Sequence, residues 1–109
     1  MKAESLHRGD VWWAELAPPE KTRPVVLVSR EEAYAVRRLV TVAYVTTRQR
    51  GIPTHVSVGR DEGLSREGVV NCDQLNTVPR TLLSEKIGSL GPAKMGEVDE
   101  ALRLALGLD

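Results

Sequence analysis

The sequence predicts a mainly β protein: a small β-barrel of about five to seven short antiparallel strands with flanking helices, one of them a C-terminal α-helix. Three observations predict this class. Short runs rich in Val and Thr alternate with turn residues over residues 10–90. From residue 92 the apolar spacing changes to that of a helix. Phe is absent and aromatic residues make up only 4%, so small aliphatic side chains must build the core. A chain of 109 residues predicts one domain, 1–109.

The first half of the chain predicts two strands, then a helical turn and a third strand. Residues 11–16 follow a Gly-Asp turn signal and predict the first strand. After a short Pro-containing loop, residues 23–29 predict a second strand, whose apolar run indicates burial on both faces. Residues 31–36 predict a helical turn, and residues 39–47, rich in Val and Thr, predict the third strand.

The second half predicts shorter strands and then a helix. Residues 48–51 predict a hairpin-like turn into a fourth strand at 54–58, and a polar loop follows. Residues 69–72 predict a short fifth strand, residues 77–78 a brief pairing, and residues 85–90 a last strand. The predicted helix covers residues 92–106, with Pro92 in its first turn and Gly107 just past its end.

The charges are unevenly distributed although the net formal charge is zero. Residues 20–60 carry eight basic and three acidic side chains, and seven of the basic ones are arginines; residues 61–109 carry five basic and nine acidic ones. The guanidinium fork suits bidentate contacts to phosphate. This asymmetry fits either a polyanionic partner or arginines scattered over a solvated surface.

Cysteine usage and hydropathy limit the possible compartment. The single cysteine, Cys72, excludes an internal disulfide and a multi-cysteine zinc site. No apolar run approaches the roughly 20 residues of a membrane span, and the first residues carry no apolar signal region. We therefore expect a cytoplasmic protein without a membrane partner.

No pattern predicts a metal or a cofactor, because no His or Cys pair has ligand spacing and phosphate-binding or dinucleotide motifs are absent. Polar side chains instead gather at predicted strand ends. Such a set suits metal-independent cleavage of RNA, which carries its own 2′-hydroxyl nucleophile. An arginine, which never loses its charge, suits the dianionic transition state. These polar residues are Arg23, Thr46, Thr47, Arg48, Arg50, Asn71, Asp73 and Gln74.

Four local motifs, in order along most of the chain, resemble the MazF/PemK/Kid family of toxin endoribonucleases, which are sequence-specific mRNA interferases. GDVW (residues 9–12) is similar to the family's opening strand, and TRPVVLVS (22–29) to its arginine-proline strand. VTT (45–47) followed by RGIP (50–53) resembles its paired-threonine segment, and GVVNCDQL (68–75) its cysteine-aspartate-glutamine strand. Each motif is weak alone; their order makes the resemblance specific.

The resemblance implies an SH3-like barrel, a homodimer, and a toxin of a type II toxin–antitoxin system. It implies cleavage of single-stranded RNA without a cofactor, leaving 2′,3′-cyclic phosphate and 5′-hydroxyl ends and thereby inhibiting translation and growth. A MazE-like antitoxin would bind across the active groove, and its complex with the toxin would bind DNA.

Carried over by motif, Arg23 is the family's catalytic arginine and Thr46 its catalytic threonine. Asp73 matches a proton acceptor of some members, whereas Asn71 stands where some members carry an arginine treated as a general acid. The loop at 18–22 is shorter than in many members, and Glu20 takes the place of an acidic or histidine residue there.

The remaining candidates have both chemical and structural interpretations. Thr47, Arg48, Arg50 and His55 are predicted RNA-binding residues. Asp73 and Gln74 either act on RNA or hold a loop through backbone hydrogen bonds. Trp12 and Trp13 alternate across a strand, so one faces the core, and the other lies at an interface or stacks on a base.

Two alternatives remain open. A CcdB-like gyrase poison uses the same barrel, but it ends in a tryptophan-containing tail that this chain lacks. A non-catalytic SH3-like module would bind RNA or protein and have no chemistry to lose.

Overall fold

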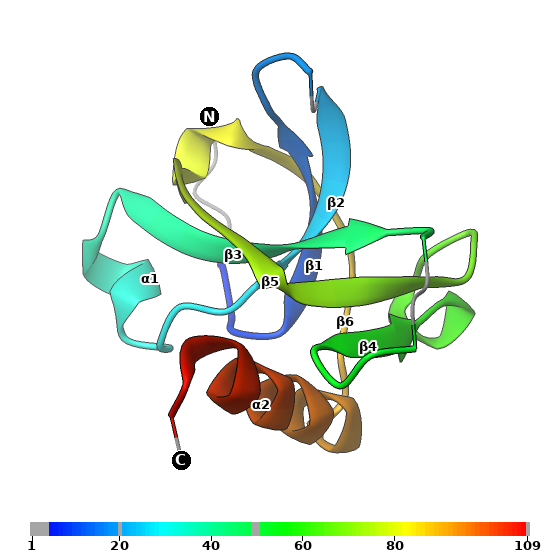
Figure 1. Cartoon of the computed structure of the whole chain (residues 1–109). Coiled ribbons are helices and arrows are strands. Elements are labelled where there is room, and N and C mark those ends of the chain that lie inside the picture. Colours follow the sequence, from blue (N-terminus) through cyan, green and yellow to red (C-terminus); the bar gives the residue numbers. More distant parts are fainter. Residues whose placement is uncertain (1–4, 20, 49–50, 109) are drawn as a thin grey trace.

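The computed structural model describes residues 5–19, 21–48 and 51–108. One curled sheet dominates it, with the strands in the order β4-β5-β3-β2-β1-β6 and every neighbouring pair antiparallel (Figure 1). The mainly β class is confirmed, and six strands fall within the predicted number. The strands are β1 (Asp10–Glu15), β2 (Thr22–Leu27), β3 (Leu39–Thr46), β4 (His55–Val58), β5 (Gly68–Pro79) and β6 (Leu83–Ser89).

The helices are short except for the last one. The predicted helical turn is α1 (Ala33–Val36), and two 3-10 turns, η1 (Arg60–Glu62) and η2 (Arg80–Leu82), follow β4 and β5. The C-terminal helix α2 (Pro92–Leu106) has the predicted bounds. Pro92 occupies its first turn, and Gly107, with φ +71°, ends it in the left-handed conformation that favours glycine.

Two predictions about strand connection were wrong. The turn near residue 50 does not join two paired strands, because β4 pairs with β5, which lies between β4 and β3. The short strand at 69–72 and the pairing at 77–78 belong to one strand of 12 residues. Its register against β3 shifts between Tyr44↔Asn71 and Ala43↔Leu75, so residues 72–74 form a bulge. The polar residues of this bulge break the apolar alternation that marks a continuous strand.

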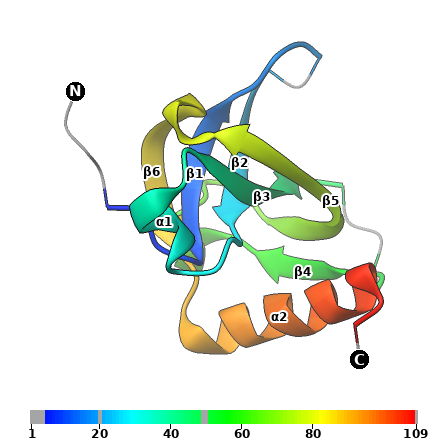
Figure 2. The ribbon, with the colours of Figure 1, turned by 90° about the vertical axis from the view of Figure 1, so that its left-hand side faces the viewer.

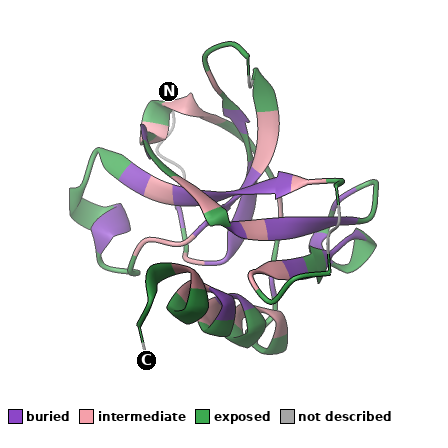
Figure 3. Ribbon diagram, viewed as in Figure 1, coloured by how far each residue is buried: buried purple, intermediate pink, exposed green. Residues whose placement is uncertain are grey.

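Two apolar clusters occupy opposite faces of the sheet, because strand side chains alternate between faces. The first includes Val26, Val45 and Val70 and packs against Val98 of α2, which lies under β4 and β5 (Figure 2). The second includes Trp12, Val25 and Tyr44. Buried residues concentrate in the central strands (Figure 3). No helix within the described ranges is both long and apolar enough to cross a bilayer.

Two glycines allow the loop after β4 to press against β6. A Cβ on Gly88 would collide with the carbonyl oxygen of Glu62. Gly63 has φ +95°, and a Cβ there would lie 2.5 Å from the carbonyl oxygen of Ile87. This close backbone approach brings the two edges of the curled sheet together and forms one wall of the site described next.

Candidate functional site

Arg23 and Thr46 meet at the ends of neighbouring strands. Val25 of β2 pairs with Tyr44 of β3, and the same register carried two residues further sets Arg23 opposite Thr46. Both side chains therefore lie on the face that also carries Tyr44. Arg23 Nη2 donates a hydrogen bond of 3.2 Å to the carbonyl oxygen of Val45. The predicted pair is thus brought together by sheet register.

The guanidinium of Arg23 packs over the aromatic ring of Tyr44. Its central carbon lies 4.7 Å from the centroid of the Tyr44 ring, a cation–π geometry. That ring is buried, and Asn76 Nδ2 donates to its hydroxyl over 3.0 Å. None of the ion pairs among the described residues involves Arg23. The positive charge is therefore positioned by the Tyr44 ring, and no acidic side chain among the described residues neutralises it.

The Thr46 hydroxyl remains able to donate. Its Oγ1 accepts a hydrogen bond of 3.2 Å from the backbone N–H of Arg48, which uses one lone pair. The hydroxyl hydrogen can then point toward an oxygen bound beside Arg23. A fixed cation and a hydroxyl donor at one strand edge are the groups that a phosphate needs.

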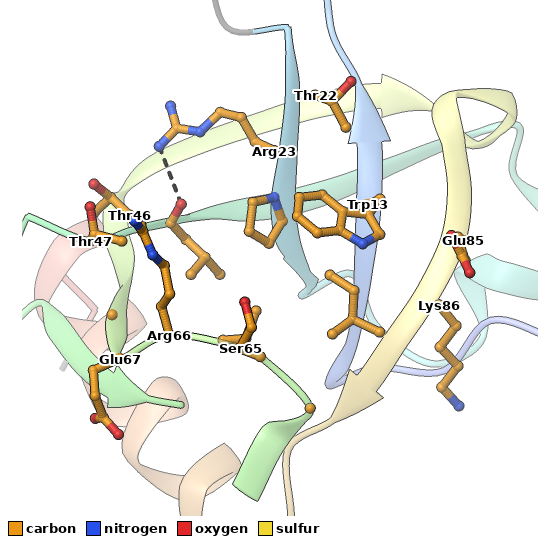
Figure 4. Close-up of a pocket in the computed structure, with 16 residues that line it drawn as sticks. Trp13, Thr22, Arg23, Thr46, Thr47, Ser65, Arg66, Glu67, Glu85 and Lys86 are labelled. Carbon is orange, nitrogen blue, oxygen red and sulfur yellow. Dashed lines mark hydrogen bonds between the residues drawn. The ribbon is translucent and has the colours of Figure 1, made fainter. Parts of the chain in front are cut away.

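A cavity of about 560 Å³ opens beside this pair (Figure 4). One wall is the row Val45, Pro24 and Trp13, which are cross-strand neighbours on β3, β2 and β1. The opposite wall is the loop at residues 63–68, and β6 contributes the third side. Arg23, Thr46 and Thr47 border one end of the cavity, where the Arg23 side chain points away from it, on the face of the sheet opposite that wall (Figure 4). The other lining residues are Thr22, Gly63, Leu64, Ser65, Arg66, Glu67, Gly68, Glu85, Lys86 and Ile87.

The predicted site residues separate into two places. Arg23, Thr46 and Thr47 line the cavity, and Arg48 follows them as an exposed residue. Asn71 and His55 lie across the sheet instead, where Asn71 of β5 is paired with Tyr44 on one side and with His55 on the other. They share a face with Arg23 but do not line the cavity. The predicted residues Glu20 and Arg50 lie outside the described residues.

Asp73 ties the loop before β4 to the bulge of β5. Its Oδ2 accepts a hydrogen bond of 2.6 Å from the hydroxyl of Thr54, and its backbone N–H donates to Asn71 Oδ1 over 3.0 Å. Gln74 is half-buried in the same bulge. Both are absent from the cavity lining. These contacts are those of a loop tether.

Two buried polar groups lie outside the cavity: the Cys72 thiol and Nδ1 of His55. Burial raises the pKa of the Cys72 thiol to about 11, so this side chain stays protonated at neutral pH and acts as core packing. His55 Nδ1 is buried and has no hydrogen-bond partner among the described atoms. Among all the residues that the structure describes, no three His, Cys, Asp or Glu side chains lie close enough together to bind a metal ion.

Sequence reasoning missed part of the cavity wall. Ser65, Arg66 and Glu67 sit in a loop whose only sequence signal is its polarity, and Glu85 and Lys86 belong to the edge strand. The alternation of the two tryptophans did predict one outward ring, and Trp13 is that ring, with 37% exposure against 3% for Trp12. Nothing in the spacing of these residues indicates that they share a cavity.

Comparison with known proteins gives a matching protein family and similar solved structures. Residues 7–106 match the family model of the PemK-like, MazF-like toxin of type II toxin–antitoxin systems. The structure is similar to the Mycobacterium tuberculosis toxin MazF-mt6, with 36% identity and a TM-score of 0.85 over 92% of this chain and 98% of that one.

Two further solved structures from mycobacterial species are similar. An endoribonuclease has 30% identity and a TM-score of 0.83 over 96% of this chain and 94% of that one. An endoribonuclease in complex with its cognate antitoxin has 29% identity and a TM-score of 0.84 over 95% of this chain and 97% of that one.

Proposed function

Because the chain belongs to the PemK-like, MazF-like toxins of type II toxin–antitoxin systems, whose members are endoribonucleases, we propose that it cleaves single-stranded RNA, mRNA above all, at specific sequences. Cleavage of mRNA inhibits translation and growth. The observation that carries this proposal is the register that sets Arg23, which no described acidic side chain neutralises, opposite Thr46 at the ends of β2 and β3.

The reaction is a transesterification within the RNA. The 2′-oxygen attacks the adjacent phosphorus, its proton passes to a base, and the bond from phosphorus to the 5′-oxygen breaks as that oxygen takes up a proton. The products are a 2′,3′-cyclic phosphate and a 5′-hydroxyl. Arg23 stabilises the extra negative charge on the phosphoryl oxygens, and the Thr46 hydroxyl donates to one of them. Neither role requires a metal ion or a cofactor.

The other predicted residues have supporting roles in this proposal. Thr47, Arg48 and Arg50 bind the RNA backbone on either side of the scissile phosphate. His55 and Asn71, on the same face of the sheet as Arg23, contact the RNA beyond it. Gln74 of the β5 bulge is a candidate for proton transfer or RNA contact, as is Glu20, which lies outside the described residues.

The proposal extends to assembly and regulation. Residues 1–109 form a single toxin domain that acts as a cytoplasmic homodimer. A MazE-like antitoxin covers the Arg23 edge and blocks RNA access, in keeping with the mycobacterial endoribonuclease that is similar to this chain and was solved with its cognate antitoxin.

RNA digestion in the presence of a chelator tests the enzymatic proposal. Purified protein is incubated with a long single-stranded RNA in excess EDTA, and the 5′ ends of the products are mapped. We expect cuts at one recurring sequence, with 5′ ends that polynucleotide kinase labels without prior phosphatase treatment. RNA that stays intact, or that is cut only after Mg²⁺ is added, contradicts the proposal. Inhibition of gyrase supercoiling by the same preparation would instead favour the gyrase-poison alternative.

Replacement of Asp73 distinguishes a loop tether from a general base. Asp73→Asn retains an oxygen that accepts from Thr54, so we expect RNA cleavage within a few-fold of wild type. Asp73→Ala removes the acceptor and should lower the free energy of unfolding by about 1 kcal/mol. Initial cleavage rates and urea unfolding measure the two effects. A rate loss of about 100-fold or more in Asp73→Asn, with unchanged stability, would show that Asp73 transfers a proton.

A further inference from the structure

The bulge of β5 decides which side chain of that strand lies beside Tyr44. The pairing with β3 passes from Tyr44↔Asn71 to Val42↔Asn76, so three extra residues, 72–74, have no partner on β3. An odd insertion exchanges the two sheet faces for every residue that follows it. Asn76 therefore lies on the same face of the sheet as Asn71 and Tyr44, where an unbroken strand would place it on the opposite face.

The ring of Tyr44 is fixed at its edge and on its sides. Asn76 Nδ2 donates a hydrogen bond of 3.0 Å to the Tyr44 hydroxyl. Tyr44 is 6% exposed and belongs to the apolar cluster that includes Trp12 and Val25, and Val25 is its cross-strand partner on β2. Asn76 is itself exposed, so it contributes the hydrogen bond to the ring and little packing.

The fixed ring in turn holds the guanidinium of Arg23. The central carbon of this group lies 4.7 Å from the centroid of the Tyr44 ring, whose negative face attracts a cation. On another side, Nη2 donates to the carbonyl oxygen of Val45 over 3.2 Å (Figure 4). An arginine at a strand end otherwise samples many rotamers. The two contacts restrict it to one place, and its other N–H groups remain donors for a phosphate.

We infer that Tyr44 and Asn76 are positioning residues for RNA cleavage, because Asn76 fixes the Tyr44 ring and the ring fixes the Arg23 guanidinium. The inference rests on the proposed function and adds two residues that lie just outside its sequence motifs. It also gives the β5 bulge a role, since the bulge brings Asn76 to the Tyr44 hydroxyl. A cation already in place needs no reorganisation when charge develops on the phosphoryl oxygens.

Cleavage kinetics of four variants test the inference. Tyr44→Leu removes the ring, and we expect kcat to fall about 10- to 100-fold with a much smaller change in KM. Tyr44→Phe keeps the ring and Asn76→Ala keeps the tyrosine, so each should lose only a few-fold. Tyr34→Leu is the matched control, because Tyr34 is also 6% exposed and belongs to the same apolar cluster, whereas the ring under Arg23 is that of Tyr44. Tyr34→Leu should lose similar thermal stability and cleave as wild type does.

Two further measurements show whether Tyr44 acts through Arg23. The double variant Arg23→Ala with Tyr44→Leu should cleave no more slowly than Arg23→Ala alone, because the ring then has no guanidinium to position. The second measurement is the NMR signal of the Arg23 Nε–Hε group, assigned by its disappearance in Arg23→Ala. The ring current should move this signal upfield of those of exposed arginines in wild type and in Tyr44→Phe, and Tyr44→Leu should abolish the displacement.

The outcomes separate this inference from the proposed function. A displaced Arg23 signal that depends on the ring, in a protein that cleaves no RNA, would reject the enzymatic proposal and leave the positioning of Arg23 supported. Wild-type cleavage by a folded Tyr44→Leu variant would overturn the inference, as would an equal loss of rate in Tyr34→Leu. Wild-type kinetics in Asn76→Ala would remove Asn76 from it. If Tyr44→Leu does not fold, the wild-type spectrum decides, because an Arg23 signal at the position of exposed arginines also overturns the inference.

Discussion

Replacing Arg23 with alanine should lower kcat/KM for RNA cleavage by about 100- to 1,000-fold while leaving the fold intact. The guanidinium is a cation that no described acidic side chain neutralises, on the strand next to Thr46, and its removal leaves the transition-state charge without its principal partner. The side chain is half-buried at a strand end and lies over the Tyr44 ring, so its loss should lower the free energy of unfolding by only about 1 kcal/mol.

The measurement compares initial cleavage rates on one RNA under single-turnover conditions, with circular dichroism and melting to verify folding. Arg37→Ala is the matched control, since Arg37 is an exposed arginine of the same positively charged segment and does not line the cavity. Arg23→Lys keeps a charge but not the planar fork, and we expect intermediate activity. Near-normal cleavage by a folded Arg23→Ala variant would remove Arg23 from the mechanism.

Replacing Gly63 with alanine should destabilise the protein by about 2–4 kcal/mol. The backbone there has φ +95°, which an L side chain rarely adopts, and the added Cβ would lie 2.5 Å from the carbonyl oxygen of Ile87. Relief of that contact requires the loop to move away from β6 and opens one wall of the cavity. RNA cleavage should therefore fall together with stability.

Gly96→Ala is the matched control for this change. Gly96 lies inside α2, and a Cβ there would meet no atom within 4 Å, so alanine should stabilise the protein by about 0.5–1 kcal/mol. Thermal melting of the two variants beside wild type checks both expectations. A Gly63→Ala variant that melts with wild type would show that the loop after β4 does not need its close approach to β6.

The secondary structure was most predictable where its signals are local. The C-terminal helix was predicted with its observed bounds, because its apolar spacing, Pro92 and Gly107 all lie within the helix or next to it. The 12-residue β5 was predicted as two fragments, because the polar bulge at residues 72–74 interrupts the apolar pattern. Its continuity depends on pairing with β3 and β4, which are distant in sequence.

The site, like the secondary structure, was predictable only where its signals are local in the sequence. Motif order alone pointed to Arg23 and Thr46 as the candidate pair, and their catalytic roles remain predictions. It also left Asp73 as either a proton acceptor or a residue that holds a loop. Its carboxylate accepts a hydrogen bond from Thr54, and its catalytic role stays a prediction. The cavity wall formed by Arg66 and Glu85 had no recognisable sequence signal.

The sequence by itself determined the fold class, the C-terminal helix, the family and the candidate pair Arg23 and Thr46, because strand alternation, helix caps and short motifs depend on residues near one another in the chain. Only the tertiary structure decided that Trp13 and Arg66 share one cavity with that pair. The reason is physical. Strand register and the glycine contacts between the loop and β6 bring together side chains that are about 50 residues apart, and no local preference records those contacts.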